Sequence, residues 1–263
     1  MSALLATTLS PRPWGVDTLP APFVSPPGQR IGEVWFTPPP QLADLLVKFI
    51  FTSEKLSVQV HPSDAQPPAG HRGKEECWLI LAADSDATLA IGFDAPLGPE
   101  ALRAAALDGS IEQLLTWFPV KPGDFFYIPA GTVHAIGPGI SLIEVQQNSD
   151  ITYRLFDYGR PRELHLDAGI AVAQGCPHDP ANRRHVPPHG AVRLVEGPHF
   201  RLDRLDGPPS TATAARYDGP LLVLPLDVAL AVAGEQVEPG QCGLAHGLAD
   251  VKFTGRSLIT QSC

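Results

Sequence analysis

Apolar and polar positions alternate most clearly in LSVQVH, residues 56–61. A period of two is the period of a β-strand, in which successive side chains point to opposite faces. Ser57, Gln59 and His61 are therefore predicted to share one face of a strand.

Further short segments have the composition and length of strands, and Gly- and Pro-rich turns separate them. They are residues 31–36, 46–51, 78–81, 88–93, 124–128, 141–147 and 152–156. Regular short strands with turn signals predict an all-β sandwich or barrel, and the jelly roll of the cupins is one such architecture.

A small helical insertion is predicted at about residues 98–117. Pro99 suits the first position of a helix, and Glu100 favours the positive end of the helix dipole. We expect one helix over residues 100–107. A capping-box pattern then predicts a second, short helix over residues 111–117.

The chain is expected to form two β domains. Residues 1–175 would be the larger domain, within which the Pro-rich residues 10–30 form a surface arm. Residues 176–190 contain several Pro and His and few apolar residues, and are predicted to be a linker. Residues 191–263 return to short strands and are predicted to be a small, jelly-roll-like C-terminal domain.

Composition limits the possible partners. The chain has 263 residues with a formal net charge of −9, which argues against nucleic acid or an acidic membrane surface as a partner. No stretch reaches the length of a membrane-spanning helix. The four cysteines form no CxxC pair and are typical of reduced thiols, so we expect a cytoplasmic location. An anionic small molecule remains compatible, because a few Arg or Lys residues suffice to bind one phosphate.

A candidate metal site follows from the shared strand face. Gln59 and His61 point the same way, and Glu76 and His134 occur in later segments. An amide oxygen, two imidazoles and a carboxylate form a mixed site that suits zinc, and also manganese, iron or cobalt. On residue type alone, half-buried histidines that hydrogen-bond to backbone atoms are the favoured interpretation, by roughly two to one.

Four stretches resemble the type I phosphomannose isomerases of the cupin superfamily, especially the short bacterial form. They are LSVQVHP (56–62), GKEECW (73–78), VKPGDFFYIPAGTVHAIGPGI (120–140) and EVQQNSDITYRLFDYGR (144–160). The stretches occur in the order of the family, and the resemblance covers about residues 10–170. It implies a cupin jelly-roll barrel and a metal-dependent aldose–ketose isomerase that interconverts mannose 6-phosphate and fructose 6-phosphate.

The resemblance also implies a ligand set for one Zn²⁺ per chain, with other divalent metals possible. The matching positions are Gln59, His61, Glu76 and His134. At position 75 the chain has Glu where many bacterial relatives have Thr, which adds negative charge beside the metal.

Three charged residues are candidate catalytic groups. Lys74 could donate to a sugar oxygen or transfer the proton, and its alternative is a solvated lysine. Arg154 matches an active-site arginine of the family, and its alternative is an ion pair with Asp150 or Asp157. Glu144 lies in an apolar strand, where an unpartnered carboxylate is costly, so it is expected to be a base, a group beside a metal ligand or an arginine partner.

Ser57 and Asp150 are candidate substrate-binding residues, and the expected partner is a small sugar phosphate. Two alternatives to the main reading stay open. The chain could isomerise a free aldose such as mannose, or it could be a cupin sugar-binding module without turnover. A cupin dioxygenase is disfavoured, because no oxygenase motif accompanies the metal residues.

Overall fold

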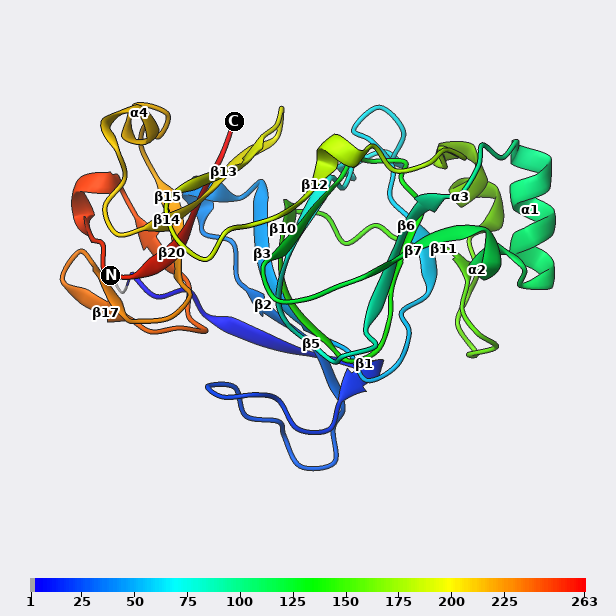
Figure 1. Ribbon diagram of the computed structural model, residues 1–263, viewed down its shortest axis with the longest axis horizontal. Coiled ribbons are helices and arrows are strands. Elements are labelled where there is room, and N and C mark those ends of the chain that lie inside the picture. Colours follow the sequence, from blue (N-terminus) through cyan, green and yellow to red (C-terminus); the bar gives the residue numbers. More distant parts are fainter. Residues whose placement is uncertain (1–2) are drawn as a thin grey trace.

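The computed structural model describes residues 3–263 and consists mainly of antiparallel strands (Figure 1). The largest sheet has seven strands, in the order β1 (Thr7–Val16), β2 (Ile31–Phe36), β3 (Leu45–Phe51), β10 (Ile140–Gln147), β5 (Glu76–Ala83), β8 (Asp124–Ile128) and β12 (Arg183–His185). A second sheet has five, in the order β11 (Tyr153–Phe156), β4 (Val58–Val60), β9 (His134–Ile136), β6 (Thr88–Phe93) and β7 (Leu115–Pro119). The predicted all-β class is confirmed.

The two sheets pack face to face through an apolar layer. Trp78 and Ile80 of the first sheet belong to the same buried cluster as Leu89 and Ile91 of the second. Figure 1 shows the two sheets enclosing a barrel-like interior, with the helices α1 and α3 on the outside of the second sheet. This packing places the inward-facing polar residues of both sheets around one space.

The C-terminal part, residues 191–263, covers the outer face of the seven-stranded sheet. Its strands are β13 (Val192–Glu196), β14 (Phe200–Asp206), β15 (Leu221–Pro225), β16 (Leu230–Val232), β17 (Glu235–Val237), β18 (Gly243–Ala245), β19 (Val251–Lys252) and β20 (Arg256–Ser262). Phe200 and Leu258 share a buried cluster with Phe49 and Val145 of the large sheet. Both faces of β3 are therefore buried, which explains why it reads as a continuous apolar run rather than an alternation.

The helices are short and peripheral. They are α1 (Pro99–Asp108), α2 (Ile111–Leu114), α3 (Leu166–Val172) and α4 (Thr211–Ala214), with 3₁₀ turns at Pro40–Leu42, Pro180–Asn182 and Leu248–Asp250. The first begins at Pro99, and Gly109 follows it with φ +83°, a conformation that favours glycine. Among residues 3–263, no helix is long and apolar enough to cross a membrane.

The second predicted helix is wrong in its length. Helix α2 ends at Leu114, and the chain enters β7 at Leu115, where we expected helix to Trp117. Leu115 pairs with Phe93, and Trp117 pairs with Ala90. Pairing with an adjacent strand therefore outweighs the local helix preference of these residues.

Two segments expected to lack regular structure form edge strands. Part of the predicted arm is β1, which pairs with β2 through an irregular register around Pro11. Proline removes one ladder donor, and an edge strand tolerates that loss. The segment predicted to be a linker contains a 3₁₀ turn and β12, which pairs with β8. The proposed division into two domains is otherwise untested, and its first two residues lie outside the described part of the chain.

Candidate active site

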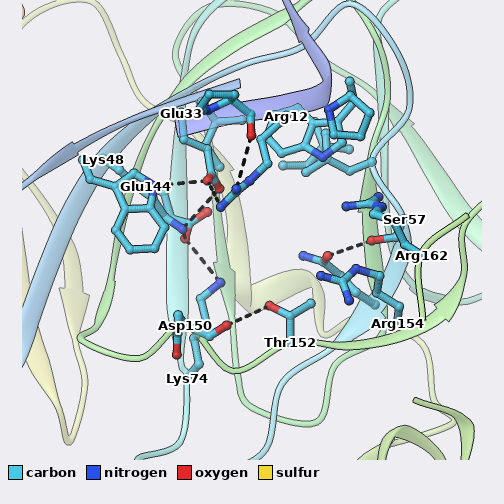
Figure 2. Close-up of a pocket in the computed structure, with 18 of the residues that line it drawn as sticks. Arg12, Glu33, Lys48, Ser57, Lys74, Glu144, Asp150, Thr152, Arg154 and Arg162 are labelled. Carbon is cyan, nitrogen blue, oxygen red and sulfur yellow. Dashed lines mark hydrogen bonds and ion pairs between the residues drawn. The ribbon is translucent and has the colours of Figure 1, made fainter. Parts of the chain in front are cut away.

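A cavity of about 500 Å³ opens between the two sheets of the larger part. Its wall includes Gln59 of β4, Glu144 of β10 and Arg154 of β11, together with Lys74. Figure 2 shows two groups of side chains on opposite sides of this cavity: Glu33, Lys48 and Glu144 on one side, and Ser57, Arg154 and Arg162 on the other. The cavity therefore has buried carboxylates and a lysine on one side and a hydroxyl and two arginines on the other.

Three buried side chains meet behind the cavity wall, in contact with the lining residues Gln59 and Lys74. Glu76 is the first residue of β5, His134 is the first of β9, and His61 follows β4 directly. The nearest ligand atoms of these three residues all lie within 4.8 Å of one another. The exposed fraction of each residue is 2% or less. The structure thus contains a His/Glu/His group that can bind a metal ion.

The hydrogen bonds of both histidines favour this role. His61 Nδ1 lies 2.8 Å from the carbonyl oxygen of Ile151, and His134 Nδ1 lies 2.9 Å from that of Thr132. A carbonyl can only accept, so each Nδ1 has the proton and each Nε2 presents its lone pair as an acceptor or ligand. Burial lowers the pKa of His134 to about 4 and also lowers that of His61, so both rings are neutral at pH 7.

Glu76 completes the donor set. Its Oε1 atom is buried, has no hydrogen-bond partner, and lies 3.4 Å from His134 Nε2. Burial and the nearby Glu144 carboxylate raise the pKa of Glu76 to about 7, although the ammonium of Lys74 opposes them. A buried carboxylate oxygen without a donor, beside two imidazole lone pairs, fits a divalent cation.

Gln59 lies beside these groups, because it is paired with His134 across β4 and β9. Its amide nitrogen is 3.2 Å from His134 Nε2, and its oxygen accepts a hydrogen bond from Ser57 at 3.1 Å. Half a turn of the terminal amide would exchange these atoms, and the hydrogen-bond network decides which orientation is adopted. The structure thus places Gln59 and Ser57 next to the cation-binding group.

Lys74 is buried against the same group. Its Nζ atom lies 2.7 Å from Glu76 Oε2, 3.1 Å from His61 Nε2 and 3.4 Å from Glu144 Oε1. Lys74 precedes β5, so strand pairing does not position it. Instead its backbone N–H donates to Pro62 at 2.9 Å. Burial lowers the pKa of Lys74, but Glu144 and Glu76 raise it by more, so it is charged.

Glu144 lies in the middle of β10 between two ammonium groups. Lys48 is 2.9 Å away and Lys74 is 3.4 Å away, and the indole of Trp78 donates to it at 3.3 Å. Burial alone would raise the pKa of Glu144, but Lys48 and Lys74 lower it to about 2. The carboxylate is therefore ionised, and its partners are lysines rather than the arginine that we considered.

Sequence reasoning missed an extension of this charge network. Lys48 also lies 3.6 Å from Glu33, and Glu33 forms a 2.6 Å ion pair with Arg12. The available signal was one charged residue inside each of two apolar strands, IGEVWF and LLVKFIF. Such a residue is costly to bury without a partner, which predicts that the two strands pair their charges. Arg12 gave no such signal, because it lies in the Pro-rich arm.

The opposite side of the cavity is cationic. Arg154 and Arg162 both line it, on the same side as Ser57, whereas Asp150 lies nearer Lys74 (Figure 2). Burial and the neighbouring Arg162 guanidinium lower the pKa of Arg154. Within residues 3–263, Arg154 forms no ion pair, so neither alternative partner is used. Asp157 instead binds Arg162 through both carboxylate oxygens, each at 2.6 Å.

Comparison with known proteins identifies relatives of one kind. No family model matches the chain. The sequence is 37% identical over 232 residues to mannose-6-phosphate isomerase ManA of Bacillus subtilis (strain 168), a match that covers 80% of this chain and 72% of ManA. It is 46% identical over 136 residues to mannose-6-phosphate isomerase of Streptococcus mutans, covering 49% of this chain and 43% of that protein.

Solved structures support the same fold. The mannose 6-phosphate isomerase from Bacillus subtilis superposes with a TM-score of 0.77 at 23% identity, over 99% of this chain and 100% of that one. A phosphomannose isomerase from Salmonella typhimurium superposes with a TM-score of 0.71 at 16% identity, over 100% of both chains. These likenesses confirm the predicted cupin jelly-roll fold with its helical insertion and smaller C-terminal β part. With the ManA match, they show that the chain belongs to the type I mannose-6-phosphate isomerase family.

Proposed function

We propose that this protein is a metal-dependent isomerase that interconverts mannose 6-phosphate and fructose 6-phosphate. The observation that supports this proposal most directly is the buried group of His61, Glu76 and His134. It lies beside a cavity whose opposite wall has two arginines. The relatives are named for this reaction. A sugar phosphate has reactive oxygens at one end and a dianion at the other, and these match the two sides of the cavity.

The proposed cofactor is one Zn²⁺ per chain, held by His61, Glu76 and His134, with Gln59 as a fourth ligand through its amide oxygen. Other divalent metals suit the same donors. When bound, the cation supplies Lewis-acid polarisation of a sugar oxygen. The neutral histidines and the unpartnered Glu76 oxygen support this assignment.

Isomerisation moves one proton between adjacent carbons and another between their oxygens, through an enediol after ring opening. Glu144 is ionised and lines the cavity, so we assign it the role of accepting the carbon-bound proton. Lys74 is charged and 3.4 Å from Glu144, which allows it to donate to the sugar oxygen as charge develops there.

The cationic side is the proposed phosphate site. Arg154 has no carboxylate partner, and Asp157 fixes the fork of Arg162 in the same wall. Ser57 and Thr152 provide hydroxyl groups there, and Asp150 is positioned for a sugar hydroxyl. Asp157 neutralises Arg162, and the guanidinium of Arg154 remains to bind an anion, which favours a phosphorylated sugar over free mannose. We further propose a cytoplasmic location, supported by four free cysteines.

The decisive test is conversion of mannose 6-phosphate to fructose 6-phosphate by purified protein, after chelation and again after zinc is restored. We expect activity to disappear and return. A folded protein that binds the sugar phosphate but converts none of it with any divalent metal would refute the isomerase proposal. It would support the alternative, a sugar-binding module without turnover.

A further inference from the structure

A turn of the C-terminal part reaches the loop that connects the metal-site residues. The turn Gly197–His199 joins β13 to β14 and closes through a hydrogen bond from Gly197 N–H to Phe200 at 3.1 Å. The N–H of Cys263 donates to the His199 carbonyl at 3.0 Å, which ties the turn to the end of β20. Hydrogen bonds within the C-terminal part thus hold the turn in place.

Two contacts link this turn to the larger part. His199 Nδ1 lies 3.6 Å from Asp64 Oδ2. Gly197 packs against Tyr127 so closely that a Cβ at position 197 would lie 2.9 Å from the phenol oxygen. That phenol donates a hydrogen bond to the carboxylate of Glu75.

Asp64 and Glu75 lie near opposite ends of the loop between His61 and Glu76, and they are connected. Asp64 accepts a hydrogen bond from Gly73 N–H at 2.8 Å and from the amide of Gln147 at 3.1 Å. The same Gln147 accepts from Glu75 N–H at 2.9 Å. One network therefore runs from the turn to both ends of the loop.

We propose that the turn Gly197–His199 is a positioning element for the metal site. His199 acts through Asp64, and Gly197 acts through Tyr127 and Glu75, so that the loop presents His61 and Glu76 at the separation that a cation requires. The C-terminal part thereby contributes to metal affinity without touching metal or substrate. This inference rests on the metal site proposed above and does not depend on which sugar is the substrate.

Metal affinity, measured by competition with a chromophoric zinc chelator, tests the proposal independently of activity. We expect His199→Ala and Tyr127→Phe each to weaken zinc binding about tenfold, the lower end of the effect of groups that orient metal ligands. Tyr127→Phe keeps the ring that packs on Phe200, so its fold is retained. His189→Ala is the control, because its side chain is 91% exposed and, within the described residues, it forms an ion pair with Asp206 alone.

A double-mutant cycle tests the route. Combining His199→Ala with Asp64→Asn should weaken zinc binding no more than the stronger single change does. Both changes remove the same connection, the contact between His199 and Asp64. Wild-type zinc affinity in both His199→Ala and Tyr127→Phe, even with lowered thermal stability, would overturn the proposal. Zinc binding by the parent chain without isomerase activity would refute the proposed reaction and leave this inference intact. No zinc binding by the parent would refute the metal site and, with it, this inference.

Discussion

At the scale of single residues, the cationic side of the cavity predicts substrate preference. Arg162→Leu removes a guanidinium that Asp157 orients toward the cavity. A charge-assisted contact is worth roughly 1.5–3 kcal/mol, so kcat/KM for mannose 6-phosphate should fall by roughly 10- to 100-fold. Residual conversion of free mannose should be unchanged. Steady-state kinetics on both sugars, with Arg103→Leu as an exposed arginine control, measures the difference. Equal losses on both sugars would contradict a phosphate role.

His178, which does not line the cavity, provides a pH-dependent prediction. Its ring is buried, its Nε2 has no hydrogen-bond partner, and burial lowers the pKa to about 4. The unfolded chain binds this proton below about pH 6.5, whereas the folded chain does not until about pH 4. Stability is therefore lost as pH falls through this window, by up to about 3 kcal/mol.

His178→Gln removes this loss because it cannot titrate. We measure the free energy of unfolding of both proteins in urea at pH 7 and pH 4.5, with chelator present. Between these two pH values, the variant should gain at least about 1–2 kcal/mol in free energy of unfolding relative to wild type. His189→Gln serves as the exposed control, for which we expect no such gain. A difference between His178→Gln and wild type that stays constant with pH would contradict the prediction.

The residues of the site differ in how far they could be predicted. The four metal-ligand candidates and Lys74 lie in two short motifs and one later segment, and the structure brings them together. Glu33 and Lys48 were missed, because a charge in an apolar strand signals a partner without identifying it. Arg162 was missed because its role depends on Asp157, which fixes its side chain only after the chain has folded.

At the scale of elements, the loop between β4 and β5 depends on Gly73. A Cβ there would lie 2.5 Å from the backbone of both Ser63 and Asp64, so it cannot be accommodated without moving the loop. Gly73→Ala should therefore displace Lys74 and lower kcat at least tenfold, with weaker zinc binding. Gly98→Ala is the comparison, because a Cβ there meets no atom within 4 Å and its φ of −76° suits alanine. Equal kinetics for the two variants would show that the loop adapts freely.

Element boundaries were predictable where turn residues limit an apolar run. The bounds of β2, β6 and β8 agree with the sequence prediction, since each is an apolar run limited by turn residues. The errors at β1, β12 and the end of α2 share one cause. Each segment takes its conformation from pairing with another strand, and that pairing cannot be predicted from the local composition of the segment.

At the scale of the whole molecule, the seven-stranded sheet is buried on both faces. β3 is accordingly a continuous apolar run, and the short strands that we predicted for residues 191–263 form the covering layer. Its position could not be predicted, because it depends on shape complementarity across the outer face. Leu4 adds a further non-local contact, since it bridges to Gly243 in the C-terminal part.

Metal binding should stabilise the entire fold, because its ligands come from separate strands. His61, Glu76 and His134 follow or begin β4, β5 and β9, so an ion held by all three joins both sheets and binds the native state alone. At free zinc one hundred times the dissociation constant, this linkage contributes about 2.7 kcal/mol. For a chain of this size that corresponds to a rise of roughly 5–10 °C in Tm. Calorimetry before and after chelation measures it. His61→Ala should show no zinc-dependent rise, and an equal rise in that variant would place the bound ion elsewhere.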